Sequence, residues 1–171
     1  WRERRVYTVN RRTLEFTSET NLDEAVSEGW GVTSDESAVN ANGFYTLYVT
    51  DGSDTVFTLD GESLRVVSQV RVYDPAAKKY WKKLNELEFV KGHLYANVWY
   101  EDVLLKIDPL TGTVVKKWDI SSLLRTEEAF QNDLKAGYKG DCLNGIAYDS
   151  SSDSLYLSGK KFHLIFKLKL L

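Results

Sequence analysis

Short stretches of alternating apolar and polar residues follow one another along the chain, separated by Gly, Asp and Asn. Three segments share one layout of three such stretches. They comprise residues 28–33, 47–52 and 56–60; residues 84–89, 94–99 and 104–109; and residues 143–148, 155–160 and 165–168. This alternation predicts half-buried β-strands, and dipeptides such as Asp51-Gly52 and Thr111-Gly112 predict the turns between them. The first two segments continue into a fourth stretch, at 64–72 and 113–120. The pattern therefore predicts an all-β protein made of repeated antiparallel sheets.

Four short strands in each repeat of roughly 40 to 60 residues are typical of the blades of a β-propeller. Residues 6–10 match the third strand of a blade and Trp1 aligns with Trp99, so we expect the chain to start within a blade. The last copy ends after its third strand, and a strand from elsewhere is expected to cover that open edge. We predict one propeller domain over 1–171, incomplete, of about three and a half blades. It comprises the outer strands of a blade (1–27), a blade (28–83), a blade with a helical insertion (84–142) and the last blade (143–171).

The helical insertion is predicted at 121–137, between the second and third copies. Apolar residues at 123, 124, 130 and 134 fit a short helix. We expect the serines at its start to cap it and Gly137 to end it.

Composition and charge exclude several classes of protein. With 171 residues, of which 43% are hydrophobic, the chain can bury one good core. A net charge of −3 argues against a nucleic-acid partner. The apolar runs are too short to predict a membrane-spanning segment. The first residues have no signal-peptide pattern, which is uninformative because we expect the chain to start within a blade. The single cysteine, Cys142, indicates either a reducing compartment or a partner cysteine elsewhere.

Six motifs occur in a fixed order. They are Glu-Gly-Trp-Gly (28–31), Leu-Asn-Glu-Leu-Glu (84–88), Ala-Asn-Val-Trp (96–99), Ile-Asp-Pro-Leu-Thr-Gly (107–112), Leu-Asn-Gly-Ile-Ala-Tyr-Asp (143–149) and Ser-Gly-Lys (158–160). Together they resemble the glutaminyl-peptide cyclotransferases, or glutaminyl cyclases, of plants and bacteria. The resemblance covers the whole chain and implies a five-bladed β-propeller.

The resemblance implies an acyltransferase that converts the N-terminal glutamine of a peptide to pyroglutamate and releases ammonia. By motif, Asn85 and Lys160 take the catalytic positions, while Trp30, Trp99 and Trp1 wall the substrate pocket. Asn144 lies where Asn85 lies in the preceding blade and is a further substrate-binding candidate. No cofactor is required, although a metal ion could occupy the central channel. The family also suggests the secretory pathway or another extracytoplasmic compartment.

Each of these residues also has a purely structural interpretation. Asn85 and Asn144 could satisfy backbone groups in turns, and Lys160 could be a solvated lysine after a glycine turn. Trp30 and Trp99 could pack between blades. His93 and His163 are isolated in the sequence, so no zinc-site spacing is present, unlike in the zinc-dependent animal enzymes.

The chain departs from the family pattern in two places. Lys161-Phe162-His163 stands where the family has Trp-Pro after Gly-Lys. The family's proton-transfer glutamate belongs to an upstream Phe-Gly-Glu-Gly motif that this sequence lacks. Glu28, Glu86 and Glu88 lie at blade starts, and one of them could replace it.

We therefore expect the N-terminal piece of the enzyme to be a partner, supplied as a separate polypeptide. The alternatives are a propeller module that binds peptides without catalysis and a purely structural fragment.

Overall fold

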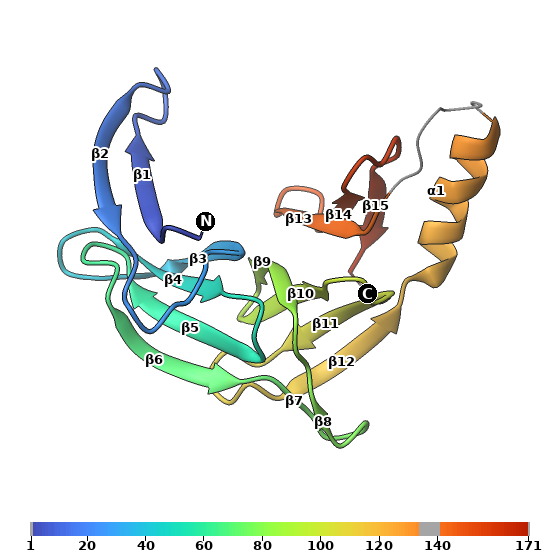
Figure 1. The fold of residues 1–171 in the computed structure, drawn as a ribbon, viewed down its shortest axis with the longest axis horizontal. Helices are drawn as coiled ribbons and strands as arrows, with labels where there is room; N and C mark the ends of the chain where they lie inside the picture. Colours follow the sequence, from blue (N-terminus) through green and yellow to red (C-terminus); the bar gives the residue numbers. More distant parts are fainter. Residues whose placement is uncertain (1, 134–140, 171) are drawn as a thin grey trace.

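Two four-stranded antiparallel sheets form the middle of the molecule (Figure 1). The computed structural model describes residues 2–133 and 141–170, so Trp1, Leu134 and Gly137 lie outside the described residues. In both sheets the strands follow each other in chain order. The first contains β3 (Gly31–Val39), β4 (Tyr45–Thr50), β5 (Thr55–Asp60) and β6 (Val66–Arg71), and the second contains β9 (Leu84–Val90), β10 (His93–Val98), β11 (Val103–Ile107) and β12 (Val114–Asp119).

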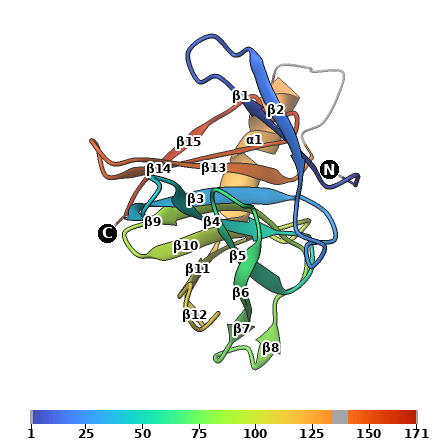
Figure 2. The ribbon, with the colours of Figure 1, turned by 90° about the vertical axis from the view of Figure 1, so that its left-hand side faces the viewer.

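Smaller sheets flank this pair. The third repeat forms a three-stranded sheet of β13 (Leu143–Asp149), β14 (Ser154–Gly159) and β15 (Phe166–Lys169). At the other end lies a hairpin of β1 (Arg5–Val9) and β2 (Phe16–Asn21), which projects away from the other sheets in Figure 1; Figure 2 gives the view turned by 90°. A short hairpin of β7 (Tyr73–Asp74) and β8 (Lys79–Tyr80) links the two large sheets. The predicted repeats thus correspond to the observed sheets.

The sheets fan out around their first strands, because β9 contacts both β3 and β13. This arrangement is propeller-like and confirms the all-β prediction. The described residues form an open fan and no closed ring, and the number of blades in a complete ring stays a prediction. Among the described residues, no helix is long and apolar enough to cross a membrane.

The hydrophobic core lies between neighbouring sheets. One cluster joins the two large sheets and includes Trp81, which is buried. Another joins the β9–β12 sheet to the β13–β15 sheet, with Trp118 packed against it. Trp81 is therefore a core residue, and Trp118 is partly buried at the edge of the core. Each sheet buries apolar side chains on its neighbours, so it depends on them for its stability.

The insertion is a helix, α1 (Ser121–Asp133), as the apolar spacing predicts. Its cap differs from the expected one. The backbone N–H of Ser121 donates to Oδ1 of Asp119 at 2.8 Å, while the Ser121 hydroxyl accepts a hydrogen bond from Arg125. The carboxylate of Asp119, the last residue of β12, thus satisfies the first helical N–H, and its negative charge suits the positive end of the helix dipole.

Candidate functional site

A pocket of about 420 Å³ opens where the three repeats meet. Its lining includes five of the six predicted site residues; the sixth, Trp1, lies outside the described residues. The complete lining is Gly29, Trp30, Asn85, Glu86, Trp99, Asn144 and Lys160. The structure thus brings the predicted residues together, and their chemical roles stay predictions.

The repeat geometry explains this convergence. Asn85 and Asn144 lie near the starts of β9 and β13, and Trp30 immediately precedes β3. Trp99 and Lys160 immediately follow β10 and β14. In an antiparallel pair, the start of one strand lies beside the end of the next. Equivalent positions in neighbouring blades therefore meet at one end of the central axis.

Trp30 and Trp99 form one wall of the pocket. Their rings are perpendicular, at 89°, with centroids 5.5 Å apart. Trp30 donates from Nε1 to Glu28 at 2.8 Å, and its ring lies so close to Gly52 that a Cβ there would come within 2.6 Å of it. Gly52 also has a φ of +79°. Glycine is therefore favoured at this turn for two reasons, the positive φ and the lack of space beside the Trp30 ring.

Trp99 carries an unsatisfied donor. Its Nε1 is buried, and within the described residues it has no hydrogen-bond partner. The Cys142 thiol lies within electrostatic reach of this N–H but does not meet the geometry of a hydrogen bond. Burial raises the pKa of that thiol, so it stays protonated and unreactive at neutral pH.

Lys160 is exposed at the pocket mouth, with Nζ 5.8 Å from the centre of the Trp99 ring. Asn85 is only 6% exposed. Its backbone carbonyl accepts a hydrogen bond from the Thr50 hydroxyl at 2.6 Å, whereas its side-chain amide bonds to none of the described residues. The Asn144 side chain likewise has no such bond in the described ranges. The turn-capping interpretation of both asparagines therefore finds no support.

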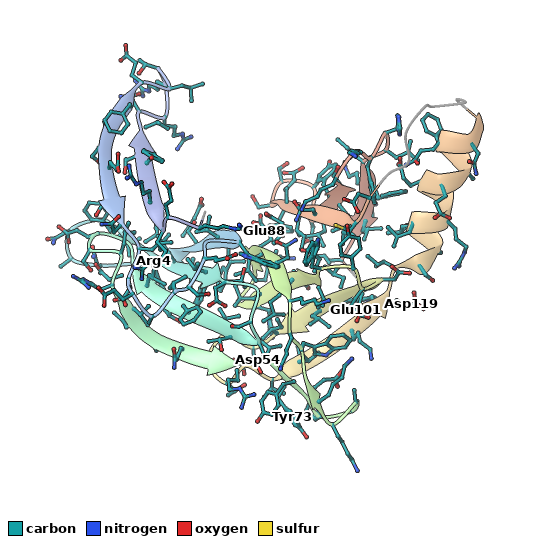
Figure 3. The ribbon with its side chains drawn as sticks, in the orientation of Figure 1. Arg4, Asp54, Tyr73, Glu88, Glu101 and Asp119 are labelled. Atoms are coloured by element: carbon teal, nitrogen blue, oxygen red, sulfur yellow. The ribbon has the colours of Figure 1, made fainter. Side chains whose placement is uncertain are left out.

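The three glutamates at the blade starts have different environments. Glu28 binds Trp30, as described above. Glu88 bridges three sheets, because it accepts hydrogen bonds from the Thr33 hydroxyl at 3.3 Å and from the Tyr148 backbone N–H at 2.9 Å (Figure 3). Of the three, only Glu86 lines the pocket. Burial, reinforced by repulsion from Glu88, raises the pKa of Glu86, while Lys160 opposes this.

Asn97 has a role that the sequence analysis missed. It is fully buried, and it lies at a β-bulge between β9 and β10. Its Oδ1 accepts the Glu86 N–H at 2.9 Å, and its Nδ2 donates to the Leu143 carbonyl of the next sheet at 2.6 Å. Thr50 has the same role in the preceding blade, where its hydroxyl accepts the Gly31 N–H at 3.0 Å. An asparagine inside an otherwise apolar strand was the signal that could have revealed this.

Replacing Asn97 by alanine is expected to lower the free energy of unfolding by about 1–3 kcal/mol, because it leaves the half-buried Glu86 N–H and the buried Leu143 carbonyl without partners. Chemical denaturation of the active complex with the original and with the variant chain measures the change. Asn42→Ala is the matched control, since Asn42 is exposed and its change should stay within about 0.5 kcal/mol. Equal stability losses in the two variants would contradict this role of Asn97.

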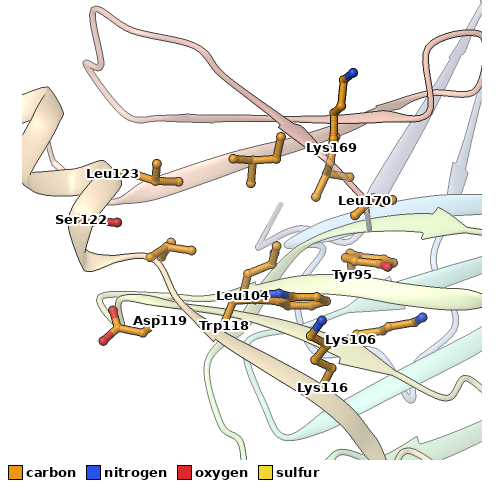
Figure 4. A pocket seen from close by; sticks show the side chains of 13 residues that line it. Tyr95, Leu104, Lys106, Lys116, Trp118, Asp119, Ser122, Leu123, Lys169 and Leu170 are labelled. Carbon is orange, nitrogen blue, oxygen red and sulfur yellow. The ribbon is translucent and has the colours of Figure 1, made fainter.

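A second cavity lies away from this pocket. It measures about 360 Å³ and opens between the outer strand β12, the start of α1 and the end of β15 (Figure 4). Tyr95 and Trp118 line it from the β9–β12 sheet, and Leu168, Lys169 and Leu170 line it from the end of β15. Within the described ranges, no three His, Cys, Asp or Glu side chains are grouped to hold a metal ion.

Comparison with known proteins agrees with the resemblance found in the sequence. The glutamine cyclotransferase family matches residues 1–170. The glutaminyl-peptide cyclotransferase of Arabidopsis thaliana is 32% identical over 147 residues, which cover 85% of this chain and 41% of the plant protein. The crystal structure of Myxococcus xanthus glutaminyl cyclase is 28% identical, with a TM-score of 0.79 over 98% of this chain and 64% of the bacterial one.

A more distant likeness concerns the fold alone. The WD40 domain of Neurospora crassa Pan2 is 15% identical, with a TM-score of 0.51 over 95% of this chain and 39% of that one. The chain spans less than two thirds of each of these relatives. On its near-complete family match, the chain belongs to the glutamine cyclotransferase family.

Proposed function

We propose that the protein to which this chain belongs converts the N-terminal glutamine of peptides to pyroglutamate and releases ammonia, as an acyltransferase. The observation that carries the proposal is the convergence of Asn85, Lys160 and two tryptophans from three repeats on one pocket. A volume of about 420 Å³ falls within the range of small-molecule sites, roughly 300–1,000 Å³. The name of the Arabidopsis relative describes the same reaction.

The reaction needs positioning and charge stabilisation more than a strong nucleophile. The substrate's α-amine has a pKa of about 7.7–8.0, so a useful fraction is neutral at pH 7. This amine forms a bond to the γ-carboxamide carbon and loses a proton. The bond from that carbon to the amide nitrogen then breaks, and the nitrogen takes up a proton and leaves as ammonia.

The pocket residues have roles that fit these steps. Lys160 stabilises the oxyanion that develops on the carboxamide oxygen, and the Asn85 amide donates a hydrogen bond to the same oxygen. Trp30 and Trp99 exclude water and hold the side chain folded back on its own amine. Asn144 binds the peptide.

We propose further that a polypeptide equivalent to the rest of the relatives' length completes the propeller and supplies the proton-transfer glutamate. Among the described residues, the β1–β2 and β13–β15 sheets have two and three strands, whereas the two central sheets have four. The smaller sheets leave β1 and β15 with an unpaired edge where further strands could be added. The β1–β2 hairpin exposes Tyr7, Leu14 and Phe16 by 56%, 75% and 62%. Unpaired edges and exposed apolar side chains favour association with further strands. An added strand on β15 would also cover the cavity beside Trp118.

The test compares residues 1–171 alone with the same residues co-expressed with a segment equivalent to the remainder of the relatives. Ammonia release from a glutaminyl peptide, together with the matching loss of one ammonia from the mass of the peptide, measures turnover. We expect aggregation and no turnover from the chain alone, and a soluble active complex from the pair. A monomeric chain that turns over substrate by itself would contradict the proposed completion. An inactive but soluble pair that binds the peptide would favour the non-catalytic module.

A further inference from the structure

The turn that carries Lys160 connects β14 to β15, and it is not paired with β15. The ladder between β14 and β15 ends at the pair Leu157 and Phe166. Residues 158–165 are therefore not held by β15. On the near side, the Lys160 N–H donates to the Cys142 carbonyl and the Asp141 N–H donates to the Lys160 carbonyl, both at 2.9 Å. Backbone hydrogen bonds to residues 141–142 thus hold the start of the turn. The part of the turn that leads into β15 needs a different support.

Glu127 of α1 supplies that support. Its side chain is buried, with 1% exposure, and it faces the turn from the insertion. Oε1 accepts the His163 backbone N–H at 2.8 Å, and Oε2 accepts the Leu164 N–H at 3.0 Å. Nδ1 of His163 lies 3.1 Å from Oε1, and Gln131 donates to that oxygen at 2.7 Å. One carboxylate thus holds two consecutive backbone N–H groups of the turn.

Phe162 connects residues 163–164, which Glu127 holds, to Lys160. Its N–H donates to the Gly159 carbonyl at 3.2 Å, and its ring packs against Gly159, where a Cβ would come within 2.6 Å of the ring. Between them the chain turns through Lys161 with φ +60°, a conformation that costs energy for a side chain larger than glycine. A fixed Phe162 therefore limits how far the Gly159–Lys160 backbone can move.

We propose that Glu127 is a positioning residue for the proposed cyclisation: by holding the amides of His163 and Leu164, it keeps the Lys160 ammonium at the pocket mouth. The inference rests on the proposed function, because it assigns Glu127 an effect only through Lys160. Burial alone would raise the pKa of Glu127, but the hydrogen bonds from Gln131 and from His163 outweigh it and lower the pKa. Glu127 is thus charged at neutral pH, and charged acceptors form the stronger hydrogen bonds.

A double-mutant cycle in the active enzyme tests the coupling. Glu127→Gln, Lys160→Ala and the double variant are compared by kcat and KM for a glutaminyl peptide. A displacement of about 1 Å of a group that acts on the transition state can cost up to about 10²-fold in rate. We expect Glu127→Gln to lower kcat by about tenfold or more with little change in KM, and to have no further effect on kcat in the Lys160→Ala background.

Glu128→Gln is the matched control, since Glu128 is the exposed neighbour on the same helix and should leave kcat unchanged. Two outcomes would overturn the inference while leaving the proposed function intact. One is a double variant in which the two losses of kcat multiply. The other is an unchanged kcat in both Glu127→Gln and Glu127→Ala. An unchanged kcat in Lys160→Ala would instead remove the proposed role of Lys160, and the inference with it. If the Glu127 variants do not fold, His163→Ala retains both amides and should show the same non-additivity with a smaller loss.

Discussion

Replacing Lys160 by alanine is expected to lower kcat for the cyclisation of a glutaminyl peptide by about 10²- to 10³-fold, the usual cost of losing one oxyanion donor. Lys160 is exposed and follows β14, so its truncation opens no cavity and should leave the melting temperature nearly unchanged. KM should change little, because the charge on the carboxamide oxygen develops only in the transition state. Steady-state kinetics in the active enzyme, followed by ammonia release, measure both quantities.

Lys161→Ala is the matched control, because Lys161 is also exposed, is adjacent in the sequence and does not line the pocket. Its kcat should equal that of the unmodified protein. An equally lowered kcat in both lysine variants would show that positive charge near the pocket matters and that the position of Lys160 does not. An unaltered kcat in Lys160→Ala would remove this residue from the site.

Replacing Trp99 by alanine is expected to lower both activity and stability. Trp99 packs perpendicular to Trp30 and contacts the Tyr100 ring, with centroids 4.9 Å apart, and its backbone N–H donates to the Lys83 carbonyl at 2.9 Å. Truncation of a large aromatic side chain costs about 3–5 kcal/mol when it is buried. Because Trp99 is half-buried, we expect the loss to lie near 3 kcal/mol, about the lower end of that range. Thermal and chemical unfolding measure it.

Trp99→Phe tests the contribution of the aromatic ring to stability apart from that of the indole N–H. Phenylalanine keeps much of the apolar contact and removes a buried donor that has no partner among the described residues. We expect it to retain most of the stability. A melting temperature that is the same for the alanine variant and the unmodified protein would contradict the view that Trp99 packs between blades, whatever the effect on turnover.

Much of this architecture was predictable from the sequence. The alternation of apolar and polar residues and the glycine turns repeat with the blade, because each strand must bury one face against the next sheet. The family motifs also identified five residues that line one pocket, since residues at equivalent positions of a repeat lie at equivalent places around its axis. The helical insertion followed from its apolar spacing, although its first N–H is satisfied by Asp119 and not by a serine.

Other features depend on segments that meet only in three dimensions. Asn97 and Leu143 are 46 residues apart, and Glu127 and His163 are 36 apart, so no local pattern pairs them. Each contact satisfies backbone groups that strand pairing leaves without partners, at a β-bulge and in the turn between β14 and β15. From the sequence alone, a glutamate on an amphipathic helix is expected to be solvated. Only the structure shows that Glu127 is buried and faces the turn of His163 and Leu164.

The sequence by itself thus determined the strands, their repeat and the residue types at the pocket, because these follow from local periodicity and from the family motifs. Only the tertiary structure decided which polar groups are buried and what they hold. Three blade-start glutamates that look equivalent in the sequence differ in the structure: Glu28 binds Trp30, Glu88 joins three sheets and Glu86 faces the pocket. Burial and hydrogen-bond partners set these differences, and both are properties of the packed sheets.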